Sequence, residues 1–181
     1  MMLEKLNLDH LAQMNFWGNN SNFLLKDYDI CFNSNLEAMY WLSVKTKNDK
    51  NKYFAIIENN SVVGYISLKN FKNDSTTMGI VIGHKFQNNH FGSKAIDDIL
   101  ALAFDEYKLK KVRLHVELFN RRAIHLYLKK GFEVSYFLYT IKEWKPNEIP
   151  DEYRMFFVFK EGFVLSKSMY MEVMSEIYRI R

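Results

Sequence analysis

A short polar stretch between an apolar run and a helical pattern is the part of the sequence best suited to chemistry. Ile80, Val81 and Ile82 end the apolar run, residues 83–93 are mostly polar and contain two glycines, and a helical pattern begins near Ser93. A loop of this kind can aim several backbone N–H groups at one point, and the dipole of the following helix adds positive potential there. We therefore interpret it as a pyrophosphate site, with a plain β–α turn as the alternative.

Hydrophobic periodicity predicts the elements that position this loop. The capping box Ser34-Asn35-Leu36-Glu37 predicts a helix over about 35–45, and the runs Tyr53–Glu58 and Val62–Leu68 predict a hairpin. The further elements expected are a short opening helix over Leu8–Phe16, strand Thr76–Ile82, helix Ser93–Tyr107, strand Val112–Leu118, helix Arg121–Lys130, strands Glu133–Ile141 and Tyr153–Phe159, and a helical tail from about Ser166 to Arg181 with Met169, Val173 and Ile177 on one side. This order predicts an α/β or α+β layer fold around one sheet.

Bulk composition narrows the class of protein. The length of 181 residues suits one domain, and the net charge of +4 fits an anionic ligand, with no Lys/Arg block typical of nucleic-acid binding. The lone cysteine, Cys31, excludes an intramolecular disulfide and a Cys-rich zinc site. The N-terminus lacks a secretory pattern, and no uncharged apolar run reaches transmembrane length. We therefore expect a cytoplasmic protein with no metal, no membrane partner and no nucleic-acid partner.

Two spaced motifs together resemble the GCN5-related N-acetyltransferase (GNAT) family. The family's later pattern, Asn-x-x-Ala-x-x-x-Tyr-x-Lys-x-Gly-Phe, is matched fully over residues 120–132. Its loop pattern, Gln/Arg-x-x-Gly-x-Gly/Ala, is matched by Gln87 and Gly92, whereas His90 replaces the first glycine. Trp41-Leu42 and the segment 63–66 are similar to the RimJ/RimL-like ribosomal-protein acetyltransferase branch.

The resemblance implies a fold, a cofactor and a set of binding residues. The implied fold is a single domain over 1–181, with a mixed, mostly antiparallel sheet flanked by helices and splayed between the fourth and fifth strands, and with a C-terminal extension at about 161–181. The implied cofactor is acetyl-CoA, which leaves as coenzyme A. The residues implied to bind it are Ile80, Val81, Ile82, Gln87, Asn88, Asn89, His90, Phe91, Gly92, Ser93, Lys94 and Asn120.

The resemblance also implies catalytic roles. Tyr127 stands at the family's general-acid position and would donate a proton to the leaving thiolate, although the same residue type also suits the buried face of a short helix. For the base, His115 can accept the amine proton directly or through water. Glu117, on the same strand face, is the alternative base or a residue that orients His115. If neither residue is catalytic, both are simply polar residues on an open sheet face. Asn120 can fix the cofactor arm or simply cap the following helix.

His90 is the main departure from the family pattern. Glycine at that place allows close backbone approach to phosphate or a positive φ, and histidine tolerates positive φ better than most residues. Asn88 and Asn89 can supply the left-handed positions instead. We expect cofactor binding to persist with altered loop geometry, the rival outcome being its loss.

The predicted reaction is transfer of an acetyl group to a primary amine, either a protein N-terminus or a small amine such as a polyamine. Trp17, Tyr28 and Trp41 are candidates for lining the acceptor pocket. The alternative function is a non-catalytic acyl-CoA-binding or interaction module on the same fold. A homodimer formed through the apolar stripe of the C-terminal extension is a further expectation.

Overall fold

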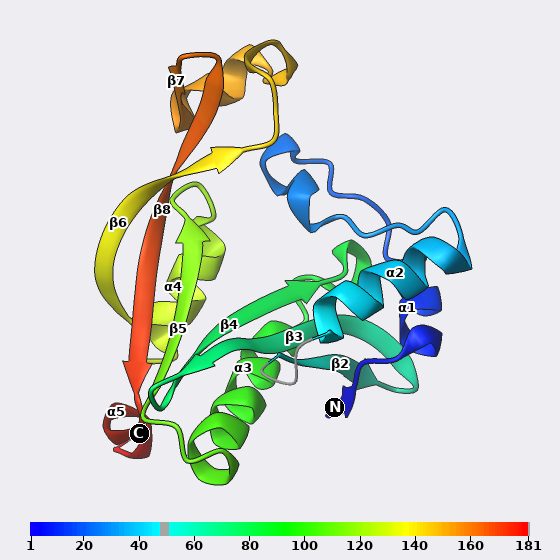
Figure 1. Ribbon diagram of the computed structural model, residues 1–181, viewed down its shortest axis with the longest axis vertical. Helices are drawn as coiled ribbons and strands as arrows, with labels where there is room; N and C mark the ends of the chain where they lie inside the picture. Colours follow the sequence, from blue (N-terminus) through cyan, green and yellow to red (C-terminus); the bar gives the residue numbers. More distant parts are fainter. Residues whose placement is uncertain (48–50, 181) are drawn as a thin grey trace. The chain divides into compact units, whose positions relative to one another are not determined.

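The computed structural model describes residues 1–47 and 51–180, which divide into two compact units, Met1–Val112 and Arg113–Arg181. Both units combine helices with mostly antiparallel strands (Figure 1), which confirms the predicted mixed α/β class. The splay between the fourth and fifth strands stays a prediction. No helix within the described part of the chain is long and apolar enough to cross a membrane.

The first unit is built on a four-stranded antiparallel meander. Its strands are β1 (Met2–Lys5), β2 (Lys52–Glu58), β3 (Ser61–Lys72) and β4 (Ser75–Ile82), and they pair in chain order. Two-residue turns join β2 to β3 at Asn59-Asn60 and β3 to β4 at Asn73-Asp74, and all four turn residues have positive φ. Asn and Asp tolerate this left-handed region, which two-residue hairpin turns require. The predicted hairpin is therefore confirmed.

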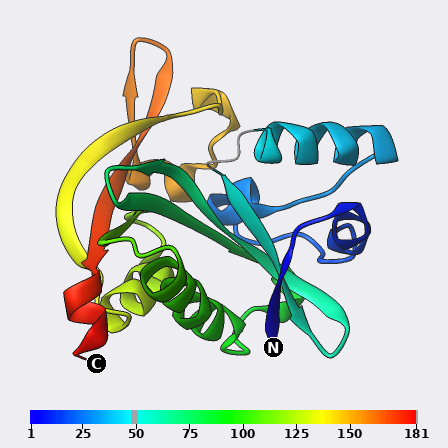
Figure 2. The same cartoon turned by 60° about the horizontal axis from the view of Figure 1, so that its bottom comes forward.

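Helices cover both faces of this sheet (Figure 2). The helices α1 (Leu8–Met14) and α2 (Asn35–Thr46) lie on one face, and α3 (Phe91–Ala101), which continues as a π-helical turn at Leu102–Glu106, packs on the other. As predicted, α2 follows an N-cap serine, Ser34, whose Oγ accepts a hydrogen bond from the Glu37 amide at 3.1 Å. Alternation along β3 serves both faces, because Tyr65 packs against Trp41 of α2 while Ile66 and Leu68 are fully buried on the opposite side.

The second unit is built around a sheet whose inner strand is the last strand of the chain. The strand β8 (Phe163–Met174) lies between β5 (Lys111–Glu117) and β6 (Glu133–Lys142), and the short β7 (Phe157–Lys160) also pairs with β8. The helix α4 (Arg121–Lys129) follows β5 and stops before Gly131, which has a φ of 82°. This ending agrees with the predicted helix and with glycine's use just beyond helix ends.

The predicted helical tail is wrong. Residues 163–174 form β8, and only the five residues of α5 (Ser175–Arg179) are helical. Burial along β8 alternates through Val164, Ser166 and Ser168, then shifts by one before Met171 and Val173, where the pairing with β6 is irregular. Met169 and Val173 are four residues apart, a spacing that fits one face of a helix and equally one face of a strand. The predicted C-terminal extension is thus largely an inner strand of this unit.

The strand predicted at Tyr153–Phe159 begins later than expected. A 3-10 turn occupies Asp151–Phe156, and β7 starts only at Phe157. The turn between β7 and β8 consists of Glu161 and Gly162, both with positive φ. A short 3-10 turn, Pro146–Glu148, lies between β6 and the turn at Asp151–Phe156, and further 3-10 turns occur at Phe23–Tyr28 and His84–Phe86.

Candidate functional site

The loop that follows β4 is anchored on the first unit's own core. The amide of Gly83 donates to the Val63 carbonyl at 3.0 Å, and the amide of Lys85 donates to the Trp17 carbonyl at 3.1 Å. The Trp17 ring lies so close to Gly83 that an added Cβ would sit 2.5 Å from its Cγ. Glycine at 83 therefore permits a close approach between this loop and a fully buried tryptophan.

The chain reaches α3 through two residues in the left-handed region. Asn88 has a φ of 66°, and His90, directly before the helix, has φ 61° and ψ 2°. His90 thus adopts the positive φ that glycine takes without penalty, and one of the two predicted asparagine positions does the same. The Lys94 amide donates to the His90 carbonyl at 3.1 Å, which starts the helical hydrogen-bonding pattern. The preceding amides, those of Phe91, Gly92 and Ser93, belong to the helix's first turn and have no intrahelical acceptor.

Side chains hold the loop in shape rather than pointing from it. The Gln87 Nε2 donates to Asn20 Oδ1 at 3.1 Å, and His84 Nδ1 lies 3.4 Å from the same oxygen. Asn20 is itself buried and donates from Nδ2 to Asp29 Oδ1. Asn89 Nδ2 donates back to the Gln87 carbonyl at 3.1 Å. Asn20 and Asp29 were not predicted as part of the site, because no sequence spacing connects them with the loop, and Asn20 is 67 positions from Gln87.

The end of β4 supplies the remaining predicted binding residues of this unit. Ile80, Val81 and Ile82 pair with Ile66, Tyr65 and Gly64 of β3 and are partly exposed. Within the first unit β4 is the last strand of the pairing order, so it pairs through its ladder with β3 on one side. Lys94 is exposed on the first turn of α3, where a charge can reach an anion bound at the helix N-terminus.

The predicted base His115 lies on β5 in the second unit and joins a stack of aromatic rings. Its ring centroid is 5.5 Å from that of Tyr170 on β8, and Tyr170 in turn stacks on Tyr136 of β6 at 4.6 Å. His115 is exposed, as predicted for this strand face, whereas Val112, Leu114 and Val116 are buried on the other. Burial is the main cause that raises the pKa of the neighbouring Tyr170 phenol.

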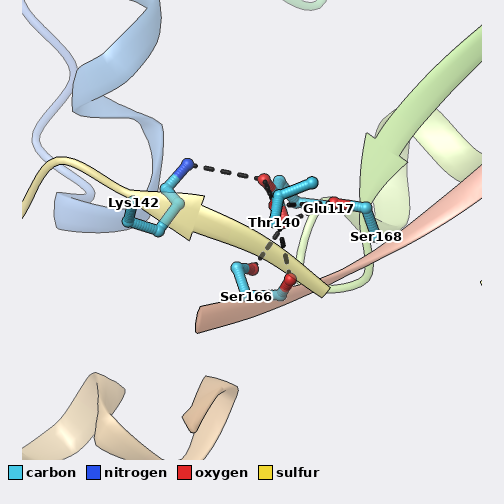
Figure 3. A network of polar contacts seen from close by, with 5 residues as sticks. All are labelled: Glu117, Thr140, Lys142, Ser166 and Ser168. Atoms are coloured by element: carbon cyan, nitrogen blue, oxygen red, sulfur yellow. Dashed lines mark hydrogen bonds and ion pairs between the residues drawn. The ribbon is translucent and has the colours of Figure 1, made fainter. Parts of the chain in front are cut away.

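Glu117, the alternative base, is the centre of a buried polar cluster (Figure 3). Its Oε2 accepts hydrogen bonds from the hydroxyls of Ser166 and Ser168, and its Oε1 lies 3.3 Å from Thr140 Oγ1 and 3.4 Å from Lys142 Nζ. Both carboxylate oxygens are therefore occupied by groups from β6 and β8. This arrangement suits a structural link between three strands better than a base that must receive a proton from an acceptor amine.

Tyr127 and Asn120 belong to α4 and its start. Tyr127 is buried, and its ring meets Phe132 edge-on at 5.8 Å, so the motif's tyrosine and phenylalanine contact each other. Asn120 Oδ1 accepts a hydrogen bond from the Ala123 amide at 3.2 Å. The helix-capping role that we considered for Asn120 is therefore present, whereas its role at the cofactor stays a prediction.

The suggested acceptor-pocket residues differ in their surroundings. Trp17 is 2% exposed and donates its indole N–H to the Val62 carbonyl at 2.7 Å, so it is a core residue and the prediction for it is wrong. Trp41 packs edge-on against Phe32, Tyr53 and Tyr65. Tyr28 ends the 3-10 turn at Phe23–Tyr28. Within the described ranges, no group of three or more His, Cys, Asp or Glu side chains is arranged to hold a metal ion.

Comparison with known proteins gives a family match and a fold match. The model of the Acetyltransferase (GNAT) family matches residues 21–132. Among curated protein sequences, none matches the chain. A solved chimera of the spermidine N-acetyltransferase SpeG from Vibrio cholerae and hSSAT is similar at a TM-score of 0.73 and 21% identity, covering 99% of this chain and 98% of that one. The spermidine N-acetyltransferase from Vibrio cholerae in complex with CoA and spermine has a TM-score of 0.70 and 22% identity, covering 98% of this chain and 97% of that one.

Proposed function

We propose that this chain, which belongs to the acetyltransferase (GNAT) family, acetylates a small polyamine-like molecule. The reaction transfers the acetyl group of acetyl-CoA to a primary amine of that acceptor. The observation that supports acetyl-CoA binding in this chain is the turn into α3, where Asn88 and His90 take left-handed conformations and leave the first amides of the helix without intrahelical acceptors. We also propose that residues 1–181 act as one acetyltransferase domain, since the family match runs across the boundary between the units.

The cofactor's diphosphate is assigned to the backbone amides of residues 87–93, with Lys94 adding positive charge. Helix N-termini favour bound anions because free N–H groups and the helix dipole act in the same direction. The backbone of Ile80, Val81 and Ile82 is assigned to the pantetheine arm, in the manner of an added strand, with one of its N–H groups polarising the thioester carbonyl. Bound acetyl-CoA would supply the activated acetyl group.

The proton transfers are assigned to residues of the second unit. Tyr127 donates a proton to the leaving thiolate, and His115 accepts the proton of the acceptor amine. His115 is preferred to Glu117 because the Glu117 carboxylate already accepts hydrogen bonds from Ser166 and Ser168 and faces Lys142. Asn120 is assigned to the cofactor arm as well as to its helix cap.

The class of the acceptor amine is the more specific part of the proposal. A polyamine is favoured because solved spermidine N-acetyltransferases share this fold over almost the whole chain, one of them in complex with CoA and spermine. A protein N-terminus, as in the RimJ/RimL-like branch, is the second candidate. A cytoplasmic location also stays a prediction. The homodimer stays a prediction without its original argument, because Met169 and Val173 of the proposed apolar stripe lie in β8 and only Ile177 lies in a helix.

An acceptor panel tests this proposal. Acetyl-CoA should raise the melting temperature, and thiol release should be faster with spermidine or spermine than with amino sugars, amino acids or peptides bearing a free N-terminus. Faster thiol release with peptides would contradict a polyamine acceptor and favour a protein N-terminus, as in the RimJ/RimL-like branch. Binding of acetyl-CoA with no turnover on any amine would instead favour the non-catalytic module.

Replacing the proposed acid tests the chemistry separately from cofactor binding. Tyr127→Phe should lower kcat by roughly 10²–10⁴-fold while the affinity for acetyl-CoA changes little, because the phenol acts only in proton transfer. Tyr139→Phe, at an exposed position on β6, is the matched control and should leave kcat unchanged. Equal kcat in the Tyr127 variant and the unmodified protein would remove Tyr127 from the acid role.

A further inference from the structure

We propose that the side-chain amine of Lys69 is a second acetyl acceptor, so that the protein acetylates itself beside its own donor strand. This inference rests on the proposed function, because it uses the donor position assigned to residues 80–82. It adds a modification site and an intramolecular activity to the acetylation of free amines.

The side chain of Lys69 on β3 extends toward the end of β4 at residues 80–82. Lys69 pairs in register with Thr77, and the residue two positions earlier, Ser67, pairs with Gly79 of β4. A Cβ added to Gly79 would lie 3.5 Å from Lys69 Nζ and 3.7 Å from its Cε. The lysine side chain therefore leaves its own register position and lies across the backbone of Gly79, the residue directly before Ile80. These separations are ordinary van der Waals distances, so the end of the Lys69 side chain lies directly beside Gly79.

The surroundings of Lys69 favour a nucleophilic amine. The residue is half-buried, and burial, followed by the nearby charge of Lys45 on α2, lowers the pKa of its ammonium group. Among residues 1–47 and 51–180, no hydrogen bond or ion pair engages Lys69 Nζ, whereas the backbone carbonyl of Lys69 accepts from Thr76 Oγ1 at 2.8 Å. Lys45 itself lies over the Trp41 ring at 5.4 Å, so its charge stays on this face of the sheet.

The proposed step balances with acetyl-CoA as the only co-reactant. The neutral amine of Lys69 uses its lone pair to bond to the thioester carbonyl carbon, the carbon–sulfur bond breaks, and the sulfur leaves with the bonding electrons. The nitrogen loses one proton, the thiolate gains one, and the products are Nε-acetyl-lysine and coenzyme A. Unlike the ammonium form of Lys69, the acetylated side chain carries no positive charge beside Lys45.

Mass spectrometry of the full-length protein tests the inference. The protein is incubated with isotopically labelled acetyl-CoA and no added amine, and label is measured at each lysine by peptide mapping. Lys69 should be labelled roughly tenfold faster or more than Lys72, since a positioned reactant avoids the entropic cost of encounter. Lys72 is the matched internal control because it is an exposed lysine on the same strand. Excess coenzyme A and the Tyr127→Phe change should slow labelling of Lys69 and leave that of Lys72 unchanged.

Two variants and two binding results decide the outcome. Lys69→Arg should abolish the fast label, and Lys72→Arg should preserve it. If acetyl-CoA binds and free amines are acetylated while Lys69 is labelled no faster than Lys72, self-acetylation is wrong and the proposed function stands. If acetyl-CoA neither raises the melting temperature nor supports acetylation of any amine, both proposals are wrong.

Discussion

At residue 90 the chain accepts a conformation that glycine adopts freely. His90 combines φ 61° with ψ 2°, and its side chain makes no capping hydrogen bond to the helix that follows. We predict that His90→Gly raises the free energy of unfolding by up to about 1 kcal/mol, because relief of left-handed strain outweighs the extra chain entropy of glycine. Urea unfolding measures the stability change, and calorimetric titration with acetyl-CoA measures binding.

The control for this substitution is His125→Gly. His125 lies inside α4, where glycine should destabilise by about 1 kcal/mol. Affinity for acetyl-CoA should be equal or higher in His90→Gly, since only the backbone of the loop is assigned to the diphosphate. A tenfold or greater loss of affinity would instead show that the imidazole contributes a contact of its own.

Single residues of the loop were only partly predictable. Asn88 and His90 were identified as left-handed candidates because short polar side chains and histidine tolerate positive φ. The link from Gln87 to Asn20 was not predictable, because tertiary folding rather than sequence spacing brings these residues together. Glu117 was expected on an open face, but the hydroxyls that enclose it come from β8, which the sequence pattern had assigned to a helix.

At the scale of elements, the Glu117 cluster links the strands β5, β6 and β8. We predict that Glu117→Gln lowers the free energy of unfolding by about 1–3 kcal/mol, because the amide replaces an acceptor for two serine hydroxyls and leaves Lys142 without its carboxylate. The rate of acetyl transfer under saturating substrates should change little if His115 is the base. Denaturant unfolding and steady-state kinetics on the same samples separate the two effects.

Glu172→Gln is the matched control for that change. Glu172 lies on β8, its side chain is 30% exposed, and its Oε2 is 3.9 Å from Arg113 Nε, so the loss of stability should stay below about 1 kcal/mol. A Glu117 variant with unchanged stability and a rate lowered by roughly 10² or more would restore Glu117 as the base.

Elements with one clear period were predicted well, and elements with a broken period were not. The helix α2 has a serine N-cap, and the hairpin of β2 and β3 has a polar two-residue turn, so local chemistry was sufficient to predict both. Along β8 the change of phase before Met171 and the inward-facing Ser166 and Ser168 removed the alternation of apolar residues. Those serines are buried because they bind Glu117. This is a tertiary contact, and the periodicity of the sequence does not reveal it.

At the scale of the whole molecule, the two parts of the proposed machinery lie in different units. The loop and the end of β4 belong to Met1–Val112, whereas His115 and Tyr127 belong to Arg113–Arg181. The family's motifs predicted both parts, and the family match over residues 21–132 includes both. The acceptor could not be predicted in the same way, because the motifs concern the cofactor and the proton transfers.

Alkaline pH should lower the stability of the chain through Tyr65. Burial raises the pKa of its phenol above the ordinary value of 10.0, and the nearby Tyr53, whose own pKa is also raised by burial, adds to the effect. Below pH 10.0 the phenol is protonated in both the folded and the unfolded chain, so its contribution is fully present. Above that pH the unfolded chain releases the proton while the folded chain retains it, so the free energy of unfolding falls as pH rises toward the folded-state pKa.

Urea unfolding at neutral pH and at a pH above 10.0 measures this effect. The free energy of unfolding should fall less between the two pH values for Tyr65→Phe than for the unmodified protein. Tyr139→Phe, at a position 53% exposed, is the control and should behave like the unmodified protein. Equal losses in all three proteins would show that the Tyr65 phenol reaches water in the folded chain.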